Sequence, residues 1–175
     1  MKVIPISGKA GHGKDTLAGF MTAVLQGNGK RVLVTHYGDL LKYICKQFFD
    51  WNGEKDDDGR TLLQHIGTDV IRKQKPDYWV DFLRNFLLMF PDQWDYVLIP
   101  DTRFPNEIVK LAPLEVYHVR IIRPGFSMLT PEQQKHISET ALDNWDDTWF
   151  TVMNDGTIWD LPGKAEMLCE SLEGL

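Results

Sequence analysis

Apolar residues in this chain follow two patterns, short continuous runs and longer stretches in which they recur every three or four positions. The short runs predict strands at about residues 2–7, 31–37, 96–101, 116–122 and 148–154. The longer stretches predict helices at about 15–26, 38–48, 62–70, 77–90 and 164–172, with a further helix start at 130–133. Strands that alternate with helices are typical of a parallel sheet covered on both faces. The pattern therefore predicts an α/β fold.

Two stretches interrupt this regular pattern. Pro5 lies inside the first run, and we expect irregular pairing there because proline cannot donate to a central strand. Residues 52–59 are polar and acidic, which predicts a loop. A chain of 175 residues suits one domain with a sizeable core, and no repeat, low-complexity segment or interdomain linker interrupts it. We therefore expect a single domain over residues 1–175.

A glycine-rich stretch joins the first predicted strand to the first predicted helix. It reads Gly8-Lys9-Ala10-Gly11-His12-Gly13-Lys14-Asp15-Thr16. Its glycines let the backbone curl with N–H groups pointing inward, and the start of the helix adds partial positive charge. This context predicts a phosphate-binding loop in which Lys14 is exposed and reaches the outer phosphates of a nucleotide. A glycine-rich turn with no ligand is the alternative.

The loop departs at one position from the usual pattern G-x-x-x-x-G-K-S/T. In that pattern the residue after the lysine supplies a hydroxyl to Mg²⁺. Here Asp15 follows Lys14, and the hydroxyl comes one residue later, at Thr16. Either Asp15 contacts Mg²⁺, directly or through water, or Thr16 does.

A second group of candidate residues follows the predicted strand at 96–101. Asp101 lies where a parallel strand ends, the edge at which open α/β sheets bind ligands, and Arg103 follows it. An acid at this place can organise Mg²⁺ and its waters beside a phosphate loop. The alternatives are a helix-capping role for Asp101 and a solvated helix position for Glu107.

Composition and charge restrict the partners of such a site. The chain has 19 basic and 25 acidic residues, a formal net charge of −6 and no arginine- or lysine-rich run. This balance argues against polymeric nucleic acid as the main ligand but permits a nucleotide. Cys45 and Cys169 are far apart, without metal-ligand spacing, and are typical of core thiols in a reducing compartment. With no signal peptide and no membrane-length apolar run, we expect a cytoplasmic monomer or homodimer.

Several motifs together resemble those of the phage and bacterial deoxynucleoside monophosphate kinase family. They are the loop at 8–16, Asp101-Thr102-Arg103-Phe104-Pro105-Asn106-Glu107, the run from Arg60 through Gly67-Thr68-Asp69 and Arg72 to Trp79-Val80, His136-Ile137-Ser138-Glu139, and Asn154-Asp155-Gly156-Thr157. The resemblance covers nearly the whole chain. It implies a P-loop NTPase fold with a five-stranded parallel sheet, a helical monophosphate-binding region at about 38–90 and a short lid at about 124–143. It also implies ATP-dependent phosphorylation of a nucleoside or deoxynucleoside monophosphate, with Mg²⁺.

Candidate roles follow from this resemblance and from phosphate chemistry. We expect residues 8–16 to hold the donor phosphates, with Mg²⁺ near Asp15, Thr16 and Asp101. The family-like segment places Arg72 in a monophosphate-side helix, and its guanidinium fits the acceptor phosphate because it binds phosphate bidentately. A surface arginine is the alternative. Arg103 can serve either phosphate group.

The remaining candidates lie in the lid and beside the acceptor. Arg120 and Arg123 flank the end of the predicted strand at 116–122 on opposite faces, and Arg123, at the strand end, is favoured to contact the transferring group. In the lid, His136 is a candidate ligand, and Glu139 either contacts substrate or pairs with an arginine that holds the lid. Three further candidates for the acceptor site are Asp39, Lys42 and Gln64. A capping acid, a solvated lysine and a solvent-facing glutamine are the alternatives.

Two other functions remain open from the sequence. A kinase of the same class can act on dephospho-coenzyme A, phosphomevalonate or a ribonucleotide instead, although the Trp79 segment and residues 101–107 favour a deoxynucleotide. A nucleotide-dependent regulator that hydrolyses its nucleotide slowly is the rival from another class. That function predicts a guanine-reading Asn-Lys-x-Asp segment, which the sequence lacks.

Overall fold

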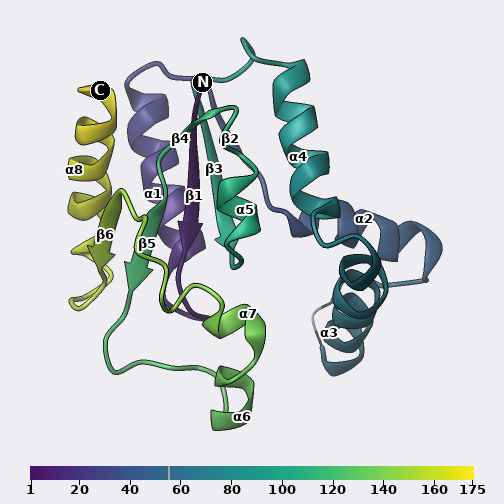
Figure 1. The fold of residues 1–175 in the computed structure, drawn as a ribbon. Helices are drawn as coiled ribbons and strands as arrows, with labels where there is room; N and C mark the ends of the chain where they lie inside the picture. The colour runs from purple at the N-terminus through teal and green to yellow at the C-terminus, as the bar shows by residue number, and fades with distance from the viewer. Residues whose placement is uncertain (55) are drawn as a thin grey trace.

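The computed structural model describes residues 1–54 and 56–175 and contains a parallel sheet with helices on both sides (Figure 1). Its strands are β1 Lys2–Ser7, β2 Val32–Val34, β3 Tyr96–Thr102, β4 Glu115–Val116, β5 Val119–Ile122 and β6 Phe150–Met153. They lie in the order β2-β3-β1-β5-β6, and β4 pairs with β1. The predicted α/β fold is confirmed. The sheet has six strands where five were expected, and β2 is shorter than the predicted strand at 31–37.

The extra strand arises because the predicted strand at 116–122 is divided in two. β4 pairs with the start of β1, and β5 pairs with its end. Between them, the backbone N–H of Tyr117 donates to the carbonyl of Val3 at 2.9 Å. The next bond of a parallel ladder on this side requires a donor from the backbone nitrogen of Pro5. Because proline carries no N–H, the ladder is interrupted there, as its position in the sequence predicted.

Alternate residues of β1 serve two separate cores. Ile4 and Ile6 pack with α1 (Lys14–Gly27) and α8 (Leu161–Glu173), whereas Val3 packs with α4 (Tyr78–Met89). In Figure 1, α1 and α8 lie on one side of β1 and α4 on the other. The strands all point the same way, so their C-terminal ends and the loops that follow them meet at one edge of the sheet (Figure 1).

A group of helices stands beside this edge: α2 (Gly38–Phe48), α3 (Asp57–Gln64) and the π-helix η1 (His65–Arg72). α3 begins inside the stretch predicted as a loop, because the carboxylate of Asp56 caps it by accepting the N–H of Gly59 at 2.8 Å. The predicted helix at 62–70 continues into η1, where the carbonyl of Gly67 accepts the indole N–H of Trp79 at 3.2 Å. Apolar spacing over eight residues does not separate a π-helix from an α-helix, and π-helices often occur at functional sites.

Residues 124–143, called the lid segment below, lie at the C-terminal edge of the sheet and carry α6 (Pro131–Gln134) and α7 (Ile137–Thr140) (Figure 1). The predicted helix start at 130–133 is confirmed by a capping box. Thr130 Oγ1 accepts the N–H of Gln133 at 3.3 Å, and the Gln133 side chain accepts the N–H of Thr130 at 3.0 Å. α7 and the short α5 (Asn106–Val109) were not predicted, because a four-residue helix leaves little periodicity in a sequence.

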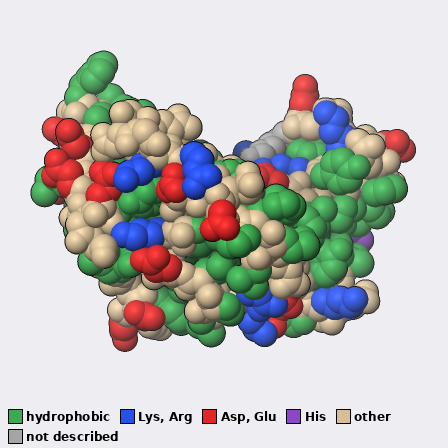
Figure 2. All heavy atoms as spheres, turned by 90° about the horizontal axis from the view of Figure 1, so that it is seen from above, with side chains coloured by type: hydrophobic (Ala, Val, Ile, Leu, Met, Phe, Trp, Pro, Cys, Tyr) green, Lys and Arg blue, Asp and Glu red, His purple; other side chains and the backbone are tan. Residues whose placement is uncertain are grey.

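Figure 2 shows the opposite end of the molecule, where the strands begin. Basic and acidic side chains are interspersed there among hydrophobic ones, so no broad basic surface is seen in this view. Among the helices of the described ranges, none is long and apolar enough to cross a membrane. Cys45 and Cys169 are buried and free, as predicted.

Candidate functional site

The glycine-rich loop (residues 8–13) connects β1 to α1 at the C-terminal edge of the sheet. Gly8, Gly11 and Gly13 adopt positive φ angles. A side chain at Gly8 would come within 2.4 Å of the carbonyl oxygen of Ile121, and one at Gly11 within 2.7 Å of the Phe126 ring. Glycine is therefore required by both conformation and space. The strand, turn and helix on which the phosphate-loop prediction depends are present.

Lys14 begins α1, but its side chain turns back over the loop. Its ammonium donates to the carbonyls of Gly8 at 2.7 Å and Lys9 at 3.0 Å. The residue is only 7% exposed, so the expectation of an exposed lysine is wrong. Burial, followed by the nearby guanidinium of Arg103, lowers the pKa of Lys14 to about 8. A phosphate group would offer this cation full negative charge in place of two carbonyl dipoles.

The far side of the loop is tied to the ends of β5 and β6. The ring of His12 is buried, and its Nδ1 accepts the backbone N–H of Arg123 at 3.2 Å. The carbonyl of His12 accepts the side-chain amide of Asn154 at 3.0 Å. A ring nitrogen that accepts a hydrogen bond carries no proton. Burial lowers the pKa of His12, which agrees with a neutral ring. The His12 side chain therefore frames the loop, together with Asn154, to which the sequence assigned no role.

Asp101 lies near the end of β3, and its carboxylate is directed at the start of α2. It accepts the backbone N–H groups of Tyr37 at 3.0 Å and Gly38 at 3.1 Å. Burial raises the pKa of Asp101, and its charge acts on Lys14 across the site. A carboxylate offers about four lone-pair sites, so these contacts leave acceptor capacity for water or a cation. The helix-start contact is observed, and the metal role stays a prediction.

Asp15, the residue that departs from the loop pattern, contacts a histidine that the sequence analysis did not single out. His36 Nε2 lies 3.1 Å from Asp15 Oδ1, and His36 Nδ1 lies 3.3 Å from Asp39 Oδ2. Asp39 also accepts the ammonium of Lys42 at 2.8 Å. Thr16 is exposed on the first turn of α1. His36 follows β2 at the C-terminal edge of the sheet. The rule that ligand-binding residues gather at the C-terminal ends of parallel strands, which located Asp101 near the end of β3, would therefore have located His36 as well.

Arg72, at the end of η1, meets the loop that follows β3. Its Nη2 donates to Oε1 of Glu107 at 2.7 Å, and its guanidinium carbon lies 4.2 Å from the centre of the Phe104 ring. The other carboxylate oxygen of Glu107 accepts the N–H groups of Arg103 at 2.7 Å and Phe104 at 3.0 Å. Glu107 is only 2% exposed, which excludes the solvated position considered for it. Burial raises the pKa of Glu107, while the charge of Arg72 opposes that rise.

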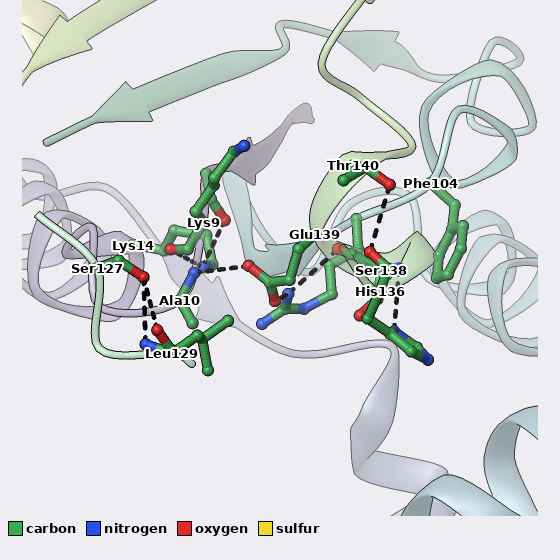
Figure 3. Close-up of polar contacts among 12 residues, drawn as sticks. Lys9, Ala10, Lys14, Phe104, Ser127, Leu129, His136, Ser138, Glu139 and Thr140 are labelled. Carbon is green, nitrogen blue, oxygen red and sulfur yellow. Dashed lines mark hydrogen bonds and ion pairs between the residues drawn. The ribbon is translucent and has the colours of Figure 1, made fainter. Parts of the chain in front are cut away.

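The lid segment is docked on the glycine-rich loop, where Glu139 points to Ala10 (Figure 3), and it also contacts Arg103. Glu139 of α7 accepts the backbone N–H of Ala10 at 2.9 Å with one carboxylate oxygen and pairs with Arg103 through the other. Lys9 forms an ion pair with Asp143 at 3.2 Å. The structure thus shows the arginine pairing considered for Glu139, and it adds a contact with the loop that the sequence did not indicate.

The other candidates of the lid region make different side-chain contacts. His136 contacts Gln64 of α3, with 3.5 Å between their side-chain nitrogens. Arg120 donates to a backbone carbonyl of the lid segment and is directed beneath it. Arg123 is exposed, and its guanidinium carbon lies 4.1 Å from the centre of the Phe126 ring. The structure therefore turns Arg120 inward, opposite to the preference for Arg123.

Two cavities lie on either side of Arg103. The lid cavity, of about 260 Å³, is lined by Ser7, Gly8, Lys9, His12, Thr102, Arg103, Arg120, Ile121, Ile122, Ser138, Glu139, Leu142 and Asp143. The helical cavity, of about 550 Å³, lies beside α2, η1 and α4, and its lining includes Tyr37, Gln64, Arg72, Trp79, Asp101, Arg103, Phe104, Glu107, His136 and Ser138. Arg103 and Ser138 border both cavities. The candidates that line neither cavity include Asp39, Lys42 and Arg123.

Comparisons with known proteins give a family match and several relatives. The family model described as deoxynucleotide monophosphate kinase matches residues 51–165. The chain is 31% identical over 156 residues to an uncharacterized protein of Ictalurid herpesvirus 1, which covers 89% of this chain and 64% of that protein. It is 30% identical over 109 residues to the deoxynucleotide monophosphate kinase of Enterobacteria phage T4. The matched region covers 61% of this chain and 43% of that enzyme. The chain thus spans less than two thirds of the length of either relative.

A solved structure also shares the fold. The structure of the Mycobacterium tuberculosis APS kinase in complex with AMPPNP and APS matches with a TM-score of 0.56 and 16% identity. The match covers 98% of this chain and 97% of that chain. At this identity the likeness shows the fold alone, and that fold is the P-loop kinase fold that the motifs predicted.

Proposed function

Because the chain belongs to the deoxynucleotide monophosphate kinase family, we propose that it transfers the terminal phosphoryl group of ATP to a deoxynucleoside monophosphate. The products are ADP and a deoxynucleoside diphosphate. The observation that carries this proposal is the position of Arg103, which borders both the lid cavity and the helical cavity. A cation between two nucleotide sites is well placed to stabilise the charge on a phosphoryl group in transfer.

The donor triphosphate is assigned to the glycine-rich loop. The loop N–H groups and the start of α1 form an anion site, and Lys14 exchanges its two carbonyl contacts for contacts with phosphate oxygens. Phosphoryl transfer asks little covalent chemistry of a protein, so these groups act by holding and neutralising the phosphates. The lid segment contacts the loop through Glu139 and Asp143.

Mg²⁺ is assigned to the donor substrate, as the ion that accompanies ATP. Over residues 1–54 and 56–175, no group of three or more His, Cys, Asp or Glu side chains is arranged to hold a metal ion. Mg²⁺ does not require a group of three protein ligands, because it keeps several waters and is commonly held by substrate phosphates with one or two carboxylates. Asp15 and Asp101 supply carboxylates beside the loop and Thr16 supplies a hydroxyl, all of them oxygen ligands of the kind that Mg²⁺ prefers.

The acceptor is assigned to the helical cavity. Its walls combine the aromatic rings of Tyr37, Trp79 and Phe104 with the guanidinium of Arg72. The rings offer flat apolar surfaces to a base, and the guanidinium keeps N–H donors for a phosphate beyond the one given to Glu107. In the reaction, a phosphate oxygen of the acceptor forms a bond to the γ-phosphorus of ATP as the bond to the ADP oxygen breaks.

The test measures products with and without an acceptor. The full chain is incubated with ATP, Mg²⁺ and each common deoxynucleoside or nucleoside monophosphate, and the nucleotides are separated by chromatography. We expect a deoxynucleoside diphosphate and an equal amount of ADP. ADP release that is independent of the acceptor would indicate a hydrolysing regulator and overturn the proposal, as would the absence of any diphosphate.

A matched pair of variants ties the activity to this site. Arg103→Ala should lower turnover by about a hundredfold or more, because an arginine at a transferring phosphoryl group contributes at least that much in other enzymes of this chemistry. Arg84→Ala, which removes an arginine of α4 paired with Asp81, should leave turnover unchanged. Equal turnover in the two variants would remove Arg103 from the reaction.

A further inference from the structure

The carboxylate of Glu139 is directed at the backbone of Ala10 in the glycine-rich loop (Figure 3). Its Oε2 accepts the N–H of Ala10 at 2.9 Å, and its Oε1 is paired with the guanidinium of Arg103. The Glu139 side chain is only 7% exposed, so this carboxylate is largely removed from water. An anion that accepts a loop N–H and an arginine together has the partners that the proposed function assigns to phosphate.

The protein backbone around Glu139 holds its carboxylate in this position. The carbonyl of Ser138 accepts a second bond from Arg103 at 3.2 Å, and the ion pair between Lys9 and Asp143 fastens the end of the lid segment to the loop. At its start, the lid segment packs so closely on Gly11 that a side chain there would meet a ring atom at 2.7 Å. A ligand that needs the Ala10 N–H must therefore move Glu139 away from an ordered contact.

We propose that Glu139 is an internal competitor of the donor site, a carboxylate that a ligand must displace from Ala10 and Arg103. The proposal rests on the proposed function, since it takes the glycine-rich loop as the donor phosphate site. A ligand binds only to molecules from which Glu139 has moved, so each apparent dissociation constant is raised by the inverse of that fraction. The factor is common to every phosphate ligand of the loop.

A common factor of this kind leaves the ratio of two affinities unchanged, but it decides which of two phosphate ligands still occupies the loop at its working concentration. A triphosphate contacts the loop through several phosphate groups and remains bound after its affinity is reduced. A monophosphate offers a single phosphate group, and the same reduction in affinity raises its dissociation constant above working concentrations. Glu139 thereby keeps the acceptor out of the donor site, where it would compete with ATP. Displacement of Glu139 by a triphosphate also frees Arg103 to contact the phosphates.

The test compares Glu139→Ala with Glu132→Gln. The control removes one negative charge from an exposed position of α6 in the same lid segment and leaves the loop contacts in place. Binding of pyrophosphate is measured by calorimetry, and initial rates are measured against ATP at rising concentrations of a deoxynucleoside monophosphate. Hydrogen bonds that involve a charged group correspond to about a tenfold change in affinity or more.

Glu139→Ala should therefore bind pyrophosphate about tenfold more tightly than the wild type, and the monophosphate should become a competitive inhibitor against ATP. The wild type and Glu132→Gln should show neither change. A residue that merely supports the lid would give the opposite result, since loosening the lid weakens ligands of the loop.

Unchanged or weaker pyrophosphate binding in Glu139→Ala, in a protein whose wild type is an active kinase, would overturn the inference and leave the proposed function standing. A wild type without kinase activity would instead overturn the proposed function. Glu139→Gln, which keeps the shape of the side chain and removes its charge, replaces the alanine variant if that variant fails to fold. It is expected to tighten pyrophosphate binding in the same direction.

Discussion

Replacing Lys14 by methionine should stabilise the nucleotide-free protein while abolishing phosphoryl transfer. Methionine keeps an unbranched apolar stem and removes the buried charge. The pKa of Lys14 is lowered from 10.5 to about 8, chiefly by burial, and a shift of that size corresponds to a cost of about 3 kcal/mol for the charged form. The lost bonds to the carbonyls of Gly8 and Lys9 come from a charged donor and offset about 1.5 kcal/mol each. The expected net stabilisation is therefore small, less than about 1 kcal/mol at pH 7.

The pH dependence of stability gives a sharper test of the same variant. The folded-state pKa of about 8 lies below the unfolded value of 10.5, so the unfolded chain binds more protons between these two values. The wild type must then gain stability as the pH rises through this window, because stability increases wherever the unfolded state holds more protons. Lys14→Met lacks this gain. Its stability advantage should shrink between pH 7 and pH 10 and reverse as the lost hydrogen bonds come to dominate.

Urea unfolding, followed by tryptophan fluorescence without nucleotide, measures both effects. Lys135→Met, at an exposed position of the lid segment, is the matched control and should change stability by less than about 0.5 kcal/mol at either pH. A Lys14→Met variant whose stability difference from the wild type is the same at pH 7 and pH 10 would refute the reasoning, since the charge of Lys14 would then not oppose folding.

Three further substitutions test the remaining assignments. Asp101→Asn keeps one of the two oxygens that accept N–H groups at the start of α2 and loses the charge, so the Mg²⁺ concentration for half-maximal rate should rise, and an unchanged titration would leave only the helix-start role. Arg72→Ala should lower acceptor efficiency by about ten- to a hundredfold with little change in binding of an ATP analogue, whereas equal weakening of both ligands would place Arg72 at the transferring group. The same variant leaves Glu107 buried without its cation and should lose about 3 kcal/mol of stability, which Glu107→Gln in the same chain should largely restore. His36→Ala frees Asp15 and should raise the KM for MgATP several-fold with the fold unchanged; an unaltered KM would limit His36 to linking α1 with α2.

The parts of the fold that could be predicted are those set by short-range patterns. The capping box at Thr130 marked the start of α6, and the apolar run with its glycine-rich turn marked β1 and α1. The parts that could not be predicted depend on partners distant in sequence. η1 is a π-helix whose Gly67 carbonyl is bonded to Trp79 of another helix. Irregular pairing at Pro5 was predicted, but the division of the strand at 116–122 into β4 and β5 was not, because it depends on which strand lies beside Pro5.

The residues of the candidate site also fall into those that a local sequence signal locates and those whose partners are distant in sequence. The strand-end rule located Asp101, and the loop pattern located the residues around Lys14, because both signals lie within a few positions of one another. The burial of Lys14 could not be seen locally, since it depends on the loop curling back over the ammonium. Likewise, Glu107 and Glu139 are acids on short helices, and only the tertiary fold shows that each is paired with an arginine.

The two acid–arginine pairs of the site differ in a way that bears on how the site works. Glu107 is nearly fully buried and is held by two backbone N–H groups as well as by Arg72, so its removal would leave those donors unpaired. Glu139 is held by one backbone N–H, and that donor belongs to the loop assigned to the donor phosphates. A phosphate oxygen can satisfy Ala10 and Arg103 in place of Glu139, whereas no substrate group replaces Glu107 inside the protein. Under the proposed function we therefore expect Arg72 to be a fixed contact for the acceptor and Arg103 to be the arginine that changes partners when the donor binds.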